Sequence, residues 1–188
     1  ALFVTPKTFE ANIRWMLQHG DIVTTDDLYN ASHRTRFIIT FDDGYGSMSS
    51  KLLPLVKEFG YPVTLFVYVD MISLRSSKNL TWKKLRGMDR QGIDIQAHSM
   101  SHKDLVKLSK SKDPGDRRSL YEELYLSKRV QELYLNKNID YYAFPFGRYD
   151  LTIIDLAANS GYRRVFSTDY GSNIITRDNY CLRRQHIK

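Results

Sequence analysis

The chain has 188 residues, 42% of them hydrophobic and 13% aromatic, so we expect residues 1–188 to form a single domain with a substantial core. No run approaches the roughly 20 apolar residues of a membrane-spanning helix, and a single cysteine, Cys181, excludes an internal disulfide and a cysteine-rich zinc site. The net charge of +7 predicts attraction to anionic surfaces, which include nucleic acid, phospholipid and acidic cell-wall polymer.

The expected helices and strands alternate along the chain. Apolar periodicity, capping residues and glycine stops predict helices at 6–19, 47–59, 82–90, 119–134 and 151–159. Short apolar runs predict strands at 37–41, 63–69, 93–97, 141–144, 164–167 and 181–187, with long loops at 70–79, 109–118 and 169–179. This alternation indicates an α/β fold with parallel strands, either a barrel or a doubly wound sheet.

Three polar segments each directly follow an expected strand: residues 42–44, 98–102 and 145–147. Because the carboxyl ends of parallel strands share one face, these segments should meet in space. His98 and His102 are four residues apart, so one helical turn would bring both imidazoles within reach of one metal ion. The alternative is a pair of surface or packing histidines beside an ordinary Asp-Asp-Gly turn, but the joint placement favours a metal site.

Adjacent aspartates at a strand end project in different directions, so Asp42 and Asp43 can divide two tasks. One would bind the metal and the other would accept a proton. Two histidines and one aspartate with an open position suit a zinc-like ion, which lowers the pKa of bound water towards about 7 and polarises carbonyl groups. This chemistry is hydrolytic.

Residues 40–44, Thr-Phe-Asp-Asp-Gly, together with residues 98–102, His-Ser-Met-Ser-His, resemble motifs of the polysaccharide deacetylases, carbohydrate esterase family 4 with the NodB-homology domain. Residues 143–147, Ala-Phe-Pro-Phe-Gly, follow in the family's order, so the resemblance covers nearly the whole chain. It implies a distorted (β/α) barrel and a hydrolase that acts on the amide C–N bonds of N-acetylated polysaccharides.

The resemblance also implies a role for each motif residue. Asp42 would be the general base, and Asp43, His98 and His102 would hold a divalent metal, zinc with cobalt or nickel as alternatives. Water activated by the metal and by the base would attack the acetamide carbonyl. The backbone N–H of Phe146 would donate to the developing oxyanion.

Two parts of the family pattern are altered in this chain. Residues 139–144 lack the arginine that orients the base in many members, so that role is vacant or passes to Arg183 or Arg184. His186 is the candidate for the acid that protonates the leaving amine, and the alternative is a solvent-facing strand residue. In some members the acid histidine instead precedes the first helix, a region that this sequence does not include.

Residues 4–28 and 143–150 resemble the corresponding segments of biofilm poly-β-1,6-N-acetyl-D-glucosamine deacetylases. This implies partial deacetylation of an exopolysaccharide by a monomeric, secreted protein at the cell surface or the outer face of the membrane. Peptidoglycan or a chitin-type polymer is the alternative substrate, and a non-catalytic carbohydrate-binding module is the alternative function. Trp82 and Tyr149, in or near strand-end loops, could stack on sugar rings, although aromatic residues at such positions commonly pack in the core.

The pattern of apolar and basic residues bears on two other kinds of partner, membranes and nucleic acids. The loop after the second strand places Met71, Ile72 and Leu74 beside basic residues, which predicts an apolar tip that contacts a membrane surface, unless these residues cover the barrel rim. The basic stretches 83–90 and 103–118 lack interleaved aromatic residues and any nucleic-acid reader motif. We therefore expect no nucleic-acid partner.

Overall fold

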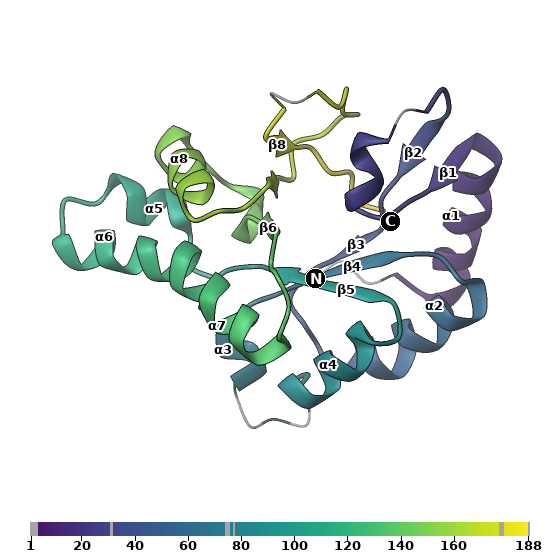
Figure 1. Cartoon of the computed structure of the whole chain (residues 1–188), viewed down its shortest axis with the longest axis horizontal. Helices are drawn as coiled ribbons and strands as arrows, with labels where there is room; N and C mark the ends of the chain where they lie inside the picture. The colour runs from purple at the N-terminus through teal and green to yellow at the C-terminus, as the bar shows by residue number, and fades with distance from the viewer. Residues whose placement is uncertain (1–3, 31, 74–75, 77, 177–178, 188) are drawn as a thin grey trace.

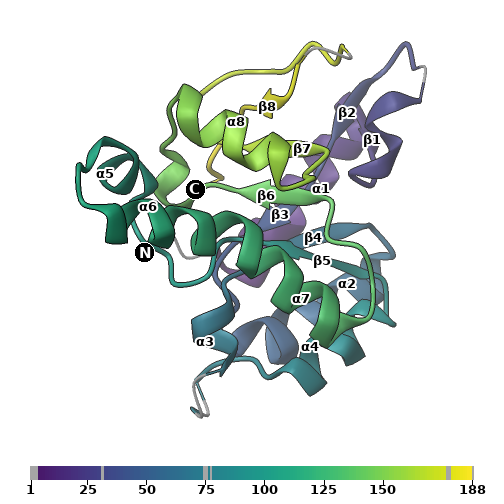
Figure 2. The same ribbon diagram turned by 60° about the vertical axis from the view of Figure 1, so that its left-hand side comes forward.

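The computed structural model describes residues 4–30, 32–73, 76, 78–176 and 179–187. Within them, six parallel strands form one sheet in the order β3-β4-β5-β6-β7-β8, and β1 pairs with β2 in a small parallel sheet. The strands are β1 Gly20–Ile22, β2 Thr35–Phe37, β3 Thr40–Phe41, β4 Val63–Val67, β5 Ile93–Ala97, β6 Tyr141–Ala143, β7 Arg164–Phe166 and β8 Cys181–Leu182. Figures 1 and 2 show the main sheet curling into a half-barrel with helices around it. The expected distorted barrel is confirmed.

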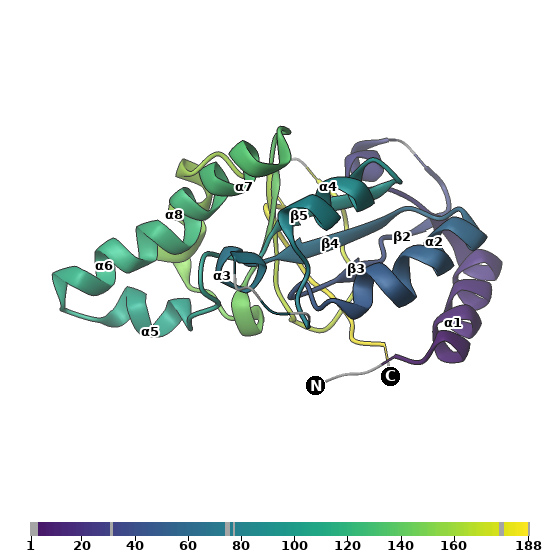
Figure 3. The same ribbon diagram turned by 90° about the horizontal axis from the view of Figure 1, so that it is seen from below.

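Apart from the first helix, which precedes β1, the helices lie between successive strands of the main sheet, as crossover connections between parallel strands do. They are α1 Pro6–His19, α2 Leu53–Phe59, α3 Val69–Ser73, α4 Trp82–Asp89, α5 Leu105–Lys110, α6 Pro114–Tyr121, α7 Ser127–Leu135 and α8 Leu151–Asn159. Short 3₁₀ turns occur at η1 Asp26–Tyr29 and η4 Pro145–Gly147, and π-helical turns at η2 Met48–Leu52 and η3 Glu122–Leu126. Because η3 joins α6 to α7 without a break, the three form one long arm, seen in Figure 3.

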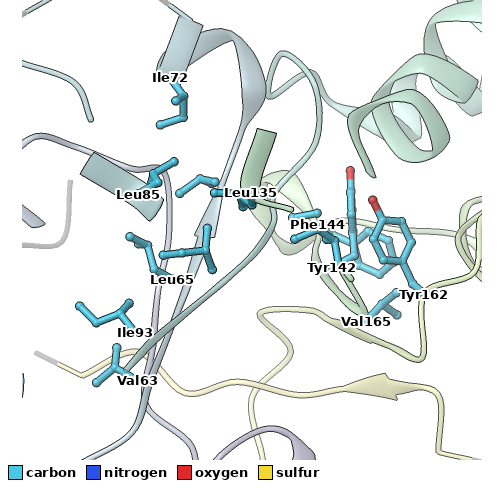
Figure 4. Close-up of a cluster of buried hydrophobic side chains, with 14 of the residues drawn as sticks. Val63, Leu65, Ile72, Leu85, Ile93, Leu135, Tyr142, Phe144, Tyr162 and Val165 are labelled. Carbon is cyan, nitrogen blue, oxygen red and sulfur yellow. The ribbon is translucent and has the colours of Figure 1, made fainter. Parts of the chain in front are cut away.

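The main sheet is buried on both faces, as the continuous apolar run of β4 indicates. On the outer face, Leu65 packs in a cluster with Leu85 of α4 and Leu135 of α7 (Figure 4). On the inner face, Phe66 packs against Phe166, with ring centroids 5.2 Å apart. The curled sheet therefore has a filled interior, and its polar site lies at the strand ends.

Several expected elements differ from the observed ones. The segment 37–41 is not one strand, because the chain leaves the small sheet at Phe37 and joins the main sheet at Thr40. The last strand ends at Leu182 rather than at residue 187, since the N–H of Arg183 donates to the Asn173 side chain instead of to a neighbouring strand. Helix α5 overlaps a segment expected to be loop, and its cap, Asp104, accepts hydrogen bonds from two N–H groups of the first turn.

The prediction that an exposed apolar tip contacts a membrane is wrong for two of the three residues that it named. Met71 and Ile72 are only 5% and 3% exposed, and both lie in α3. Ile72 belongs to the main core cluster (Figure 4), so it covers the barrel rim, the alternative raised above. Leu74 lies outside the described residues. Among the described helices, none is both long and apolar enough to span a bilayer.

Candidate metal centre

The structure brings Asp43, His98 and His102 together at the carboxyl ends of β3 and β5. One ligand atom from each lies within 4.8 Å of the others. Asp43 Oδ1 is 3.7 Å from His98 Nε2 and 3.5 Å from His102 Nε2, and the two Nε2 atoms are 3.2 Å apart. Atoms bound about 2.0–2.2 Å from one tetrahedral ion are separated by roughly 3.3 Å. These three donors therefore fit a single zinc-like ion.

His98 is prepared for ligation by its surroundings. It is buried at the end of β5, and its Nδ1–H donates to the carbonyl oxygen of Ala143 at 2.7 Å. This hydrogen bond leaves the Nε2 lone pair free and fixes the ring orientation, as a carbonyl or carboxylate bonded to the other ring nitrogen does for metal-bound histidines in general. Burial lowers the pKa of His98, against the opposing effect of Asp42, so the ring is neutral, as a metal ligand must be.

The segment that joins the two histidines is not the helical turn expected from their spacing. Residues 98–102 are irregular, and Ser99 and His102 have left-handed backbone angles, with φ of 90° and 61°. Asp43 also has a positive φ, 77°. Each non-glycine residue held in this region costs about 1–3 kcal/mol and needs support from neighbouring structure. Strained turns, rather than a helix, bring these side chains together.

Asp42 faces the same site and is held by an arginine. Arg184 Nη1 and Nη2 donate to the two carboxylate oxygens of Asp42 at 2.7 and 2.9 Å, and Arg184 Nε donates to the carbonyl of Ser167. Burial raises the pKa of Asp42, but His98 and Arg184 outweigh it, and the net shift of the pKa is downward. Asp42 is therefore ionised at neutral pH. Of the two arginines considered from the sequence, Arg184 has this position, whereas Arg183 is exposed.

The η4 turn forms one wall of the site. Phe146 adopts a left-handed conformation, with φ 58°, and its ring is 59% exposed and packs edge-on against His102, at 4.7 Å between centroids. In the part of the chain that the structure describes, the Phe146 N–H has no hydrogen-bond acceptor. This donor is therefore free to bind an external oxygen atom.

The same turn depends on Gly147, whose φ is 67° and whose added Cβ would overlap Thr168 Oγ1. We expect Gly147→Ala to lower the free energy of unfolding by about 1–3 kcal/mol, measured by urea denaturation. Gly87→Ala is the matched control: in mid-helix α4 a new Cβ meets only Gln91 Nε2, at 4.0 Å. This variant should gain about 0.5–1 kcal/mol. Equal effects of the two substitutions would contradict the prediction.

Three other residues singled out from the sequence lie outside the cluster of ligand atoms. Trp82 stacks on Tyr134 at 4.8 Å between centroids, so it packs α4 against α7. Tyr149 stacks on Phe144, and its hydroxyl donates to Asp169 at the edge of a hollow of about 520 Å³. His186 is exposed, and no hydrogen bond, ion pair or ring contact of this residue occurs within the described ranges.

Sequence reasoning missed two residues near the site. Tyr68 directly follows β4, and its ring centroid is 5.1 Å from that of His102. The strand-end rule missed it because the expected strand, 63–69, ran past Tyr68, whereas β4 ends at Val67. Glu123, a buried acid in η3, accepts hydrogen bonds from Met100 and Ser101, between the two histidines. In the sequence Glu123 is one of several charged residues in a predicted helix, so no local pattern indicated that it contacts the site.

The chain is thus an α/β half-barrel protein whose curled parallel sheet has, at its carboxyl edge, a candidate metal site of one aspartate and two histidines beside an arginine-held carboxylate. The sequence profile of the polysaccharide deacetylases matches residues 30–165, more than half of the chain. The chain belongs to this family, whose members hydrolyse amide bonds.

Individual relatives agree with this assignment. A Bacillus subtilis protein described as a polysaccharide deacetylase, YxkH, is 26% identical over 196 residues, which cover 100% of this chain. A Staphylococcus epidermidis poly-beta-1,6-N-acetyl-D-glucosamine N-deacetylase is 25% identical over 195 residues, or 96% of the chain. The alignments cover 66% of each relative's length, so these proteins extend well beyond the matched part.

Solved structures show the same fold. Streptococcus pyogenes deacetylase PplD, in complex with acetate, superposes with a TM-score of 0.81 at 25% identity, over 98% of this chain and 82% of that one. IcaB from Ammonifex degensii gives a TM-score of 0.83 at 20% identity, over 100% of this chain and 88% of that one. The half-barrel of this chain is therefore the fold of known deacetylases.

Proposed function

We propose that this chain hydrolyses the acetamide groups of an N-acetylated polysaccharide. The observation that carries the proposal is the geometry at the sheet edge, where Asp43, His98 and His102 can share one ion beside the ionised, arginine-held Asp42. A divalent ion held there would acidify a bound water and polarise the substrate carbonyl.

The residues around this centre supply the remaining tasks. Asp42 lies 4.0 Å from His98 Nε2, near enough to the metal position to accept a proton from the attacking water. The free N–H of Phe146 is a donor for the oxygen that becomes negative as the carbonyl is attacked. His186 is proposed as the acid for the leaving amine, with a histidine from another part of the protein as the alternative.

We further propose poly-β-1,6-N-acetyl-D-glucosamine, a biofilm exopolysaccharide, as the polymer. The Staphylococcus epidermidis relative carries this activity in its name and matches 96% of the chain. Such a substrate places the protein outside the cell, at the cell surface, and we propose that it acts there as a monomer on the extended polymer. The net charge of +7 would also favour contact with anionic cell-wall polymers. Peptidoglycan or a chitin-type polymer remains the second candidate. The metal site would contact only the acetamide group, which all these polymers contain.

The test is acetate release from β-1,6- and β-1,4-linked N-acetylglucosamine oligomers, with chelator-treated protein and with added Zn²⁺, Co²⁺ or Ni²⁺. We expect metal-dependent release from the β-1,6 oligomers. Release from the β-1,4 oligomers alone would move the assignment to chitin or peptidoglycan. No release from either, in protein that binds the metal, would favour a carbohydrate-binding role.

A further inference from the structure

The short segment between the two histidines is held from one side by a single buried acid. The N–H groups of Met100 and Ser101 donate to Glu123 Oε2 at 3.1 and 2.9 Å. The Ser101 hydroxyl donates to Glu123 Oε1. One carboxylate thus accepts three hydrogen bonds from two consecutive residues of the loop that carries His102.

The other side of the same segment is fixed by the start of α3. The carbonyl of Ser99 accepts from the N–H of Val69 at 3.2 Å, and that of Met100 from the N–H of Asp70 at 2.9 Å. The carbonyls therefore point to α3 while the following N–H groups point to Glu123. Hydrogen bonds on both sides of the loop therefore stabilise the left-handed backbone angles of Ser99 and His102.

Glu123 contacts the loop from a point at which its helix is widened. It lies in the π-helical turn η3 and is only 2% exposed. In a widened turn some main-chain carbonyls lack their usual helical partners, and here hydroxyl groups donate to them. Ser127 Oγ donates to the carbonyl of Glu123 at 2.6 Å, and the Tyr162 hydroxyl donates to the carbonyl of Leu124 at 2.9 Å. Single π turns inside α-helices often occur at functional sites.

In the part of the chain that the structure describes, the Glu123 carboxyl group forms no ion pair and accepts its hydrogen bonds from groups of the loop. Burying an ionised carboxylate is unfavourable unless hydrogen bonds compensate, and here the loop supplies them. For stability alone, an apolar residue at this place in the helix would avoid that desolvation. The arrangement is understandable if the acid has a task in the loop.

We propose that Glu123 is a positioning residue of the metal centre: it holds residues 99–101 so that His102 Nε2 stays 3.2 Å from His98 Nε2, ready to share an ion. The proposal rests on the metal site proposed above. It assigns to a residue 21 positions beyond His102 in the sequence the task of setting that ligand's place.

The experiment compares the Zn²⁺ affinity of wild type, Glu123→Ala and Glu123→Gln, by competition with a chromogenic chelator, and the visible spectrum of each Co²⁺ form. We expect Glu123→Ala to bind Zn²⁺ about 10–100-fold more weakly and to change the Co²⁺ spectrum. Glu123→Gln keeps an oxygen acceptor for the loop N–H groups, so it should recover most of the affinity. Both readouts are independent of activity.

Lys128→Met is the matched control, because Lys128 is also buried and lies in the same arm but bonds to Ile139 and Glu132 instead of to the loop. It should lower Tm and leave Zn²⁺ affinity unchanged. An equal loss of affinity in this control, or wild-type affinity in folded Glu123→Ala, overturns the proposal. If Glu123→Ala does not fold, Glu123→Asp decides, since its shorter side chain should weaken Zn²⁺ binding and unchanged affinity would refute the role. A wild-type chain that binds no Zn²⁺ would overturn the metal site itself.

Discussion

Asp42→Asn is expected to lower kcat for acetate release by about 10²–10⁴-fold while Zn²⁺ affinity stays close to that of wild type. Asparagine has the same shape and still accepts a hydrogen bond from Arg184, so the local structure should persist. It cannot accept a proton at neutral pH. The measurement pairs steady-state kinetics on N-acetylglucosamine oligomers with calorimetric titration of Zn²⁺.

The adjacent residue provides the comparison. Asp43 Oδ1 lies 3.5–3.7 Å from both histidine nitrogens, so Asp43→Asn replaces the one carboxyl group among the three candidate metal ligands by a weaker amide ligand. We expect this variant to lose Zn²⁺ affinity first, with activity partly restored at higher metal concentration. Normal metal binding and turnover in both variants, or the opposite pattern, would show that the two aspartates are wrongly assigned.

Arg184→Ala is expected to lower kcat by about 10–100-fold with little change in Zn²⁺ affinity. Its guanidinium donates to both oxygens of Asp42 and is itself fixed by the Ser167 carbonyl, so it sets the orientation of the base. Lysine should not replace it, because an ammonium group lacks the planar fork that matches a carboxylate. The measurement is kcat and KM for the alanine and lysine variants under saturating Zn²⁺.

The neighbouring arginine is the control for the loss of one positive charge. Arg183 is exposed, and its main-chain N–H and carbonyl bond to the side chain of Asn173. Arg183→Ala should therefore keep the wild-type kcat. If the two alanine variants lose activity equally, general charge rather than the orientation of Asp42 explains the effect.

The sequence was sufficient for the position of the site and for most of its donors. Polar residues directly after buried strands predicted that residues 42–44 and 98–102 would meet, and the structure brings ligand atoms of Asp43, His98 and His102 within 4.8 Å of one another. The choice of Asp43 rather than Asp42 as the ligand came from the family resemblance. This succeeded because parallel strands place their carboxyl ends on one face whatever the details of the helices. The roles of these residues, and that of His186, stay predictions.

The sequence was not sufficient to predict the backbone conformation and the long-range contacts that position the side chains of the site. A spacing of four predicted a helical turn from His98 to His102. The structure instead has left-handed backbone angles there, because the loop N–H groups donate to Glu123 and the loop carbonyls accept from the start of α3. The pairing of Arg184 with Asp42 joins residues 142 positions apart. Local patterns contain no information on contacts at such distances. Only the resemblance to the polysaccharide deacetylases indicated that the role was vacant or passed to Arg183 or Arg184.

The ion pair between Asp42 and Arg184 joins an early part of the chain to a late one, and the two parts are synthesised at different times. During synthesis the metal-binding donors, from residues 43 to 102, leave the ribosome well before Arg184 does. The three candidate metal ligands are therefore synthesised before the arginine that holds Asp42. Because Arg184 lies two residues beyond β8, we expect fraying of this last described strand to release the Asp42 carboxylate while Asp43, His98 and His102 keep their places.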